Sequence, residues 1–249
     1  MRAAGGVSEL ARQIGVSQPS VSNWMRVPAE RVVSVESVTG VDRAVLRPDL
    51  YDGNEMAGNI DEVDVARAQE YALLATLLTR APDAPLLSRL SGLRADASPL
   101  GLAHAALSEA AEKTTVERVE REFFDLFIGL GRGELMPYGS YYLTGLLHER
   151  PLARLREDLA RISVGRAEGV VEPEDHAGIL CEIMSGLVSY RLPAPPNSER
   201  MIFDKHLAPW IGRFFTDLEH AEAADFYKRL GMLGRVFMDI EAEAFDLPA

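Results

Sequence analysis

Two stretches decide the fold of this chain: Phe123–Tyr142, which reads FFDLFIGLGRGELMPYGSYY, and Glu172–His176, which reads EPEDH. The first is the aromatic end of a helix that runs into a glycine-broken loop and then into Pro137–Tyr142. The second opens a helix predicted to reach about Tyr190, because proline suits a first helical turn and acidic side chains complement the positive end of a helix. Together they predict helices joined by one specialised loop.

That loop contains three glycines, Gly129, Gly131 and Gly133. They do not form a nucleotide-binding motif, because no predicted strand precedes them and no Gly-Lys-Ser/Thr follows. The loop is instead predicted to let Pro137–Tyr142 fold back beside the next helix.

Tyr138 and Tyr142 lie four positions apart and are expected to share one face of a helix, with Ser140 between them. Amphipathic tyrosine rings make good walls for a groove that grips an apolar peptide and hydrogen-bonds its backbone. The alternative is ordinary packing of both tyrosines in the core, and the residues taken alone favour it.

The composition indicates a globular protein without disulfides. The chain has 249 residues, 47% of them apolar, which suffices for one large domain or two. Cys181 is the only cysteine, and the longest apolar stretches, such as Tyr71–Leu78, fall far short of the roughly 18 residues of a membrane span. No apolar run follows Met1–Gly6, so no signal peptide is predicted and a cytoplasmic location is expected.

The net charge of −12 is unevenly distributed. Residues 1–52 hold six Lys/Arg and six Asp/Glu, so the remaining residues hold 20 and 32 and carry the whole excess. An acidic surface repels nucleic acid and favours basic partners, with plain solubility as the alternative explanation.

The stretch VSELARQIGVSQPSVSNW near the amino end predicts a helix-turn-helix. Gly15 stands where a sharp turn needs positive φ, and Ser17 can cap the following helix. Val21 and Trp24 are expected to pack back against the small side chain of Ala11.

This spacing resembles the YdaS-like and Cro-like modules over about residues 4–51. The resemblance implies a domain of residues 1–52 whose second helix enters the major groove of DNA. The side chains that would face base edges are Ser17, Gln18, Ser20, Ser22 and Asn23. A packing or protein-contact module is the alternative, because the segment has no net positive charge to neutralise phosphates.

Residues 53–60 lack apolar periodicity and are rich in turn formers, which predicts a linker. Residues 61–249 predict an all-α bundle of roughly nine or ten helices, since apolar residues recur at three-four spacing and no stretch alternates with period two for long. The expected helices are 61–80, 86–93, 98–111, 114–127, 150–162, 174–190, 198–206, 210–221 and 223–245.

The motifs predict neither an enzyme nor a metal or cofactor site. His176 and its acidic neighbours supply too few ligands for a metal, and the other histidines show no matching pattern. An Asp175–His176 pair lacks a nucleophile, because Ser140 sits in no elbow motif.

Three separated segments carry a more specific signal: Phe124–Gly129 with Pro137–Tyr142, then Glu172–His176, then Phe203–Trp210. In this order they resemble the signatures of the TorD/DmsD family, cytoplasmic chaperones for molybdenum-cofactor enzymes, over about residues 60–245. Leu130 departs from the pattern, since many relatives carry proline there.

The resemblance implies a TorD-like helical bundle that binds the twin-arginine signal peptide, or the apo form, of a molybdopterin-dependent oxidoreductase and assists cofactor insertion before export. An acidic body with an aromatic groove would suit such a peptide, which joins a basic end to an apolar run. Asp175 would face the arginines, and His176 would orient or report on binding. The implied client-binding residues are Phe127, Pro137, Tyr138, Ser140, Tyr142, Glu172, Asp175 and His176.

Residues 132–142 and Leu143–Gly145 look most like the subgroup associated with formate dehydrogenases, which implies a formate dehydrogenase as the client. A monomer and a dimer are both compatible with the family. The alternative function is a transcriptional regulator whose helical body senses a peptide or a cofactor state and whose amino-terminal module binds DNA.

Overall fold

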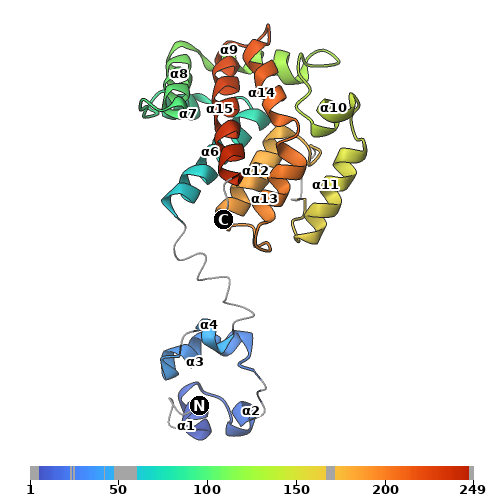
Figure 1. The fold of residues 1–249 in the computed structure, drawn as a ribbon. Helices are drawn as coiled ribbons and strands as arrows, with labels where there is room; N and C mark the ends of the chain where they lie inside the picture. Colours follow the sequence, from blue (N-terminus) through green and yellow to red (C-terminus); the bar gives the residue numbers. More distant parts are fainter. Residues whose placement is uncertain are drawn as a thin grey trace. The chain divides into compact units, whose positions relative to one another are not determined.

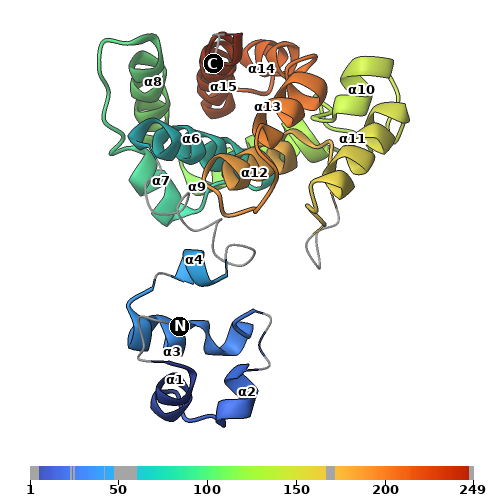
Figure 2. The same ribbon diagram turned by 60° about the horizontal axis from the view of Figure 1, so that its bottom comes forward.

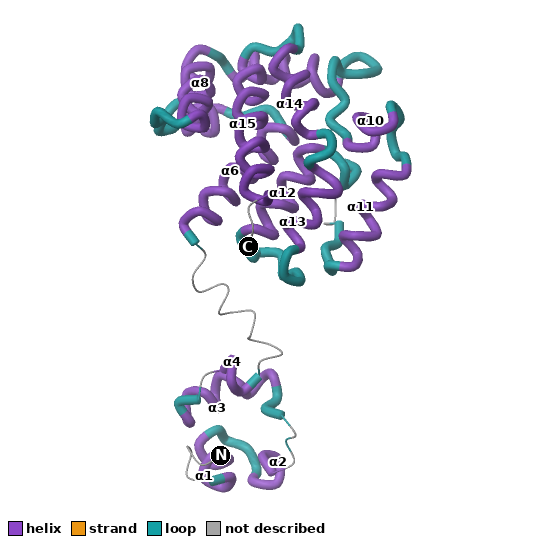
Figure 3. The backbone as a smooth tube through the Cα atoms, viewed as in Figure 1, coloured by secondary structure: helices purple, strands orange, loops and turns teal. Residues whose placement is uncertain are grey.

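The computed structural model describes residues 6–22, 24, 26–41, 43–47, 61–166 and 172–246. The chain divides into two compact units, Met1–Asp61 and Glu62–Ala249. Across the described ranges the backbone forms helices and loops without a strand, which confirms the all-α prediction (Figure 3). None of the helices in these ranges is long and apolar enough to span a bilayer. The predicted linker, residues 53–60, lies outside the described residues.

The first unit is a helix-turn-helix, as predicted. Gly15 takes φ 71° between its first two helices, and Ser17 Oγ accepts from the Ser20 amide at 3.3 Å at the start of the second. Trp24 packs on a small core formed by Leu10, Ala11, Ile14, Val21 and Val35. The elements of this unit are α1 (Val7–Gln13), α2 (Gln18–Ser22), a 3₁₀ turn (Ala29–Arg31), α3 (Val32–Thr39) and α4 (Arg43–Leu46).

The second unit is a bundle of α-helices, shown from two directions in Figures 1 and 2. Its helices are α6 (Glu62–Thr79), α7 (Ala84–Leu90), α8 (Pro99–Lys113), α9 (Val116–Phe123), α10 (Gly139–Thr144), α11 (Arg150–Arg161), α12 (Ala177–Val188), α13 (Ser198–Ile202), α14 (Ile211–His220) and α15 (Phe226–Asp246). Local sequence sets several starts: the side chains of Asp83, Ser98 and Thr115 each accept a backbone N–H at a helix N-terminus.

Helix α6 packs against α12, and α15 packs against both α14 and α8. Tyr71, Tyr227 and Phe214 are fully buried in the core between them. The approach of α15 to α14 requires a glycine, because a Cβ at Gly234 would lie 2.2 Å from the ring of Phe215. This packing places α10 and α11 at one side of the bundle, beside the start of α12 (Figure 2).

Three predicted helices differ at their ends. The helix expected over 174–190 begins at Ala177, because His176 takes the N-cap conformation and its amide donates to the carbonyl of Pro173. The helices expected over 114–127 and 198–206 each finish in a π-helical turn, Phe124–Ile128 and Phe203–Leu207. A π turn inserts one residue into the helical ladder, which the spacing of apolar residues does not show.

Candidate functional site

The two signature segments lie side by side through an antiparallel bridge between Tyr138 and His176. The Gly139 amide donates to the Asp175 carbonyl at 2.9 Å, and the Ala177 amide donates to the Pro137 carbonyl at 2.8 Å. The rings of Tyr138 and His176 meet edge to face with centroids 5.1 Å apart. Residues distant in sequence therefore build one local structure.

Asp175 and His176 fix the two helices that begin here. Oδ2 of Asp175 accepts from the Ser140 amide at 2.8 Å in the first turn of α10. Nδ1 of His176 accepts from the Gly178 amide at 3.1 Å in the first turn of α12. Both residues are buried, at 4% and 5% exposure, so they position the site, and Asp175 also lines it.

A cavity of about 240 Å³ opens beside this bridge, and we call it the acidic pocket. It is lined by Tyr138, Ser140, Leu147, His148, Glu172, Pro173 and Asp175. The Tyr138 hydroxyl donates to Oε2 of Glu172 at 2.7 Å, and burial together with this carboxylate raises the pKa of the phenol, which stays protonated.

Ser140 is the least satisfied side chain of the acidic pocket. The residue is 1% exposed, and its Oγ has no hydrogen-bond partner among the described residues. An unpaired buried hydroxyl costs free energy, so Ser140 Oγ is an unsatisfied polar atom in the wall of this pocket.

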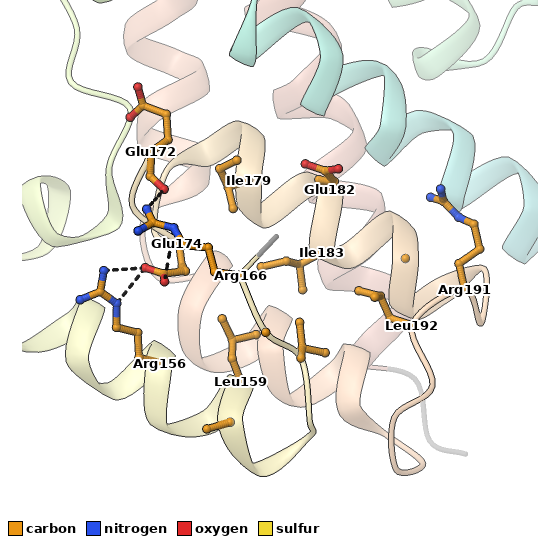
Figure 4. A pocket seen from close by; sticks show the side chains of 14 residues that line it. Arg156, Leu159, Arg166, Glu172, Glu174, Ile179, Glu182, Ile183, Arg191 and Leu192 are labelled. Atoms are coloured by element: carbon orange, nitrogen blue, oxygen red, sulfur yellow. Dashed lines mark hydrogen bonds and ion pairs between the residues drawn. The ribbon is translucent and has the colours of Figure 1, made fainter. Parts of the chain in front are cut away.

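A second cavity of about 400 Å³ lies between α11 and α12, and we call it the apolar pocket (Figure 4). Aliphatic side chains form its middle, among them Leu159, Ile183 and Leu192. At one end Glu174 accepts ion pairs from Arg156 at 2.8 Å and from Arg166 at 4.0 Å.

Four of the predicted client-binding residues do not line the acidic pocket: Phe127, Pro137, Tyr142 and His176. Phe127 packs between Phe123 and Tyr227, with ring centroids at 5.2 and 5.4 Å, as part of the core. Pro137 is buried and contributes its carbonyl to the bridge. The aromatic segment before the loop therefore supports the site from within.

The prediction that Tyr138 and Tyr142 share a helical face is wrong. Tyr138 precedes α10 in extended conformation, held there by the bridge to His176. Tyr142 points to α14 instead, where its hydroxyl donates to Asp217 at 2.8 Å and its ring lies 5.5 Å from that of Trp210. Neither Tyr142 nor His176 lines the acidic pocket.

Sequence reasoning missed the apolar pocket. Ile179 and Ile183 are one helical turn apart on α12, which is also the spacing of a core-facing stripe. Glu172 was predicted as a client-binding residue, but only the fold shows that it lines both pockets.

Most of the predicted DNA-facing side chains are exposed in the first unit. Ser17, Gln18, Ser20 and Ser22 lie on its surface, and Asn23 lies outside the described residues. Two side-chain hydrogen bonds link them, one between Ser17 Oγ and Ser20 Oγ at 2.7 Å and one from Gln18 Nε2 to Ser22 Oγ at 2.9 Å.

His176 makes the site sensitive to acid. Burial lowers its pKa from 6.5 to about 4, against the opposing effect of Glu172 and Asp175. The unfolded chain takes up this proton near pH 6.5 and the folded chain does not, so stability falls as the pH drops toward 4, by about 2 kcal/mol at pH 5.

The variant His176→Asn keeps a side-chain acceptor for the Gly178 amide but cannot titrate. Thermal unfolding measured from pH 7.5 to pH 5 should show a shallower loss of Tm in the variant. Equal slopes in the two proteins would show that His176 does not carry this acid sensitivity.

Two family models match parts of this chain. Residues 93–216 match the family model described as nitrate reductase delta subunit, and residues 1–55 match the model described as bacterial toxin YdaS. The chaperone protein TorD of Shewanella loihica is 21% identical over 202 residues, which cover 72% of this chain and 92% of that protein. TorD of Vibrio atlanticus is 22% identical over 132 residues, which cover 49% of this chain and 61% of that protein.

A crystal structure described as a redox enzyme maturation protein from Archaeoglobus fulgidus aligns with a TM-score of 0.47 and 19% identity, over 70% of this chain and 93% of that chain. The sequence matches support a chaperone of molybdoenzyme maturation. In sequence the chain is similar to TorD chaperones over most of its length, and it carries a YdaS-like helix-turn-helix at its amino end. Its named relatives are chaperones, which fits the prediction that it is not an enzyme.

Proposed function

We propose that the TorD-like unit binds the twin-arginine signal peptide, on its own or on the apo form, of a molybdopterin-dependent oxidoreductase. In the cytoplasm it would hold this client back from export while the cofactor is inserted. The acidic pocket is the observation that carries the proposal, because it brings two carboxylates, Glu172 and Asp175, to the lining of one cavity beside the unpaired hydroxyl of Ser140.

The chemistry of the acidic pocket suits a guanidinium group. Arginine offers five N–H donors in a planar fork, and carboxylate and hydroxyl oxygens are its natural acceptors. Glu172 and Asp175 are each oriented by a hydrogen bond, from the Tyr138 hydroxyl and from the Ser140 amide. The pocket is thus preorganised, which reduces the entropic cost of binding.

For the client we propose a formate dehydrogenase. The support is the likeness of residues 132–142 and of Leu143–Gly145 to the subgroup associated with those enzymes. Co-purification of the chain with a formate dehydrogenase catalytic subunit from its own host tests this assignment, and recovery of a different molybdoenzyme alone would overturn it.

Replacing Glu172 with glutamine should weaken binding of a synthetic Arg-Arg signal peptide by about fivefold, the size expected for a partly exposed ion pair. Glu172 is the better residue to change, because replacing Asp175 would also remove the acceptor of the Ser140 amide. Fluorescence anisotropy with a labelled peptide measures the dissociation constant.

Glu120→Gln is the matched control, since it makes the same change in net charge at an exposed position of α9 that lines neither pocket. Equal weakening by both variants would attribute the effect to overall charge and remove the role of Glu172. Absence of any peptide binding by the unaltered protein would overturn the proposed function.

A second proposal is that the first unit binds DNA, which the exposed polar surface of α2 favours. Gln18 is exposed there, and glutamine pairs well with adenine in the major groove. A gel shift on the DNA upstream of the neighbouring genes tests this, with Gln18→Ala expected to lower affinity. No shift at low salt would leave the unit a packing or protein-contact module.

A further inference from the structure

The apolar pocket has the form of a peptide-binding cavity. Its volume of about 400 Å³ lies within the range typical of ligand pockets. One wall is α12, through Ile179 and Ile183, and the facing wall is α11, through Leu159 (Figure 4). Leu192 lies beside Ile183 near the end marked by Arg191, opposite the end that holds Glu174.

Glu172 joins this cavity to the acidic pocket. Its carboxylate accepts from Tyr138 in the acidic pocket, while its backbone carbonyl accepts from Arg166 at the rim of the apolar pocket (Figure 4). A chain that leaves the acidic pocket past Glu172 therefore passes the Arg166–Glu174 ion pair and then meets aliphatic side chains.

The charges at this junction balance, because Arg156 and Arg166 carry two positive charges and Glu174 and Glu172 carry two negative ones. Arg156 and Arg166 both pair with Glu174, whose side chain is only 14% exposed. Burial opposes ionisation of this carboxyl, but the hydrogen bond and the charges of the arginines lower its pKa overall. The junction consequently does not repel a basic ligand that lies in the acidic pocket.

We infer that the apolar pocket holds the apolar run that directly follows the arginine pair of the client peptide. The inference rests on the proposed function, and it assigns the two chemically distinct parts of one peptide to two adjoining cavities. The polarity of the bound peptide follows: its basic end lies at Tyr138 and Ser140, and its apolar run passes between α11 and α12 toward Arg191.

The test fills the cavity from an exposed position. Ala160 lies on α11, is exposed and lines the apolar pocket, so Ala160→Trp should occupy the cavity without disturbing the core. Ala153→Trp makes the same change at an exposed position of α11 that lines neither pocket. Equal thermal stability of the two variants is checked first.

Two labelled peptides are compared by anisotropy, using the full chain. One has Arg-Arg followed by a run of leucine and alanine, and the other has the same arginines followed by serine and glycine. Ala160→Trp should weaken binding of the apolar peptide by about tenfold, the effect of losing burial of one aliphatic side chain, and leave the serine peptide unchanged. Ala153→Trp should change neither.

The outcomes separate the inference from the function on which it rests. Suppose the unaltered chain prefers the apolar peptide and Ala160→Trp binds it as tightly as Ala153→Trp does. The apolar run then does not bind in the apolar pocket, although signal-peptide binding stands. If Ala160→Trp weakens both peptides equally, the cavity does not discriminate the apolar run and the inference is overturned. If the unaltered chain binds neither peptide, both proposals fall.

Discussion

Replacing Glu241 with alanine is expected to destabilise the TorD-like unit by about 3–5 kcal/mol, the cost of breaking a buried ion pair by removing one partner. Glu241 is fully buried near the end of α15. Its carboxylate accepts from Nε and Nη2 of Arg67 at 2.7 and 2.9 Å, and from the Tyr71 hydroxyl at 2.9 Å. The alanine variant leaves that hydroxyl and most of the guanidinium without an acceptor.

Asp64 limits the loss, because it still accepts from Nη1 of Arg67 at 2.7 Å. Glu243→Ala, at an exposed position of the same helix, is the matched control and should cost less than about 0.5 kcal/mol. Urea unfolding followed by circular dichroism gives both free energies. The double variant Arg67→Met with Glu241→Leu should recover part of the loss, since no unpaired charge is then buried. A midpoint for Glu241→Ala equal to that of Glu243→Ala would contradict the role of the pair.

The sequence showed most of the bundle because the signals for its helices are local. Ser98 followed by Pro99 predicted the start of α8, and the side chain of Ser98 caps that helix by accepting from the Gly101 amide. Three-four spacing likewise placed α6, whose bounds Glu62–Thr79 fall close to those expected. Helix caps and apolar periodicity act over one or two turns, so they can be recognised in a single sequence.

The geometry of the site was harder to predict, because it depends on contacts between segments that are distant in the sequence. Tyr138 was expected on a helix, and the bridge to His176 keeps it extended. Asp175 was expected to face the client, yet its carboxylate also accepts a hydrogen bond from the Ser140 amide, 35 positions away in the sequence. Spacing along one segment contains no information about the partner segment that decides these orientations.

Buried charged residues are equally hard to predict from the sequence. Glu241 lies in an amphipathic helix rich in acidic residues, where a glutamate is normally predicted to face solvent. Its partner Arg67 is 174 positions earlier in the chain. Only the packing of α6 and α15 brings the two together, so the cost of truncating Glu241 follows from the fold and not from a motif.

Glu122→Ala is expected to cost about 3 kcal/mol, because it removes the acceptor of three backbone amides at the start of α15. Oε1 of Glu122 accepts from the amides of Asp225 at 2.7 Å and Tyr227 at 2.6 Å, and Oε2 accepts from the Phe226 amide at 3.1 Å. Glu122 is 8% exposed, so water cannot readily replace the carboxylate. The helix that it caps is 21 residues long and contacts both α8 and α14.

Glu134 provides the comparison, because it makes the same kind of contact at the surface. Its carboxylate accepts from the amides of Glu222 at 2.7 Å and Ala223 at 2.9 Å, and its residue is exposed. Water can take over these two amides, so Glu134→Ala should cost about 1 kcal/mol. Burial raises the pKa of Glu122, so a neutral acceptor is tolerated at this position. The cost of Glu122→Gln should therefore lie between the costs of Glu122→Ala and Glu134→Ala. Urea unfolding of the three variants measures the order, and equal costs at Glu122 and Glu134 would show that burial of the cap contributes nothing.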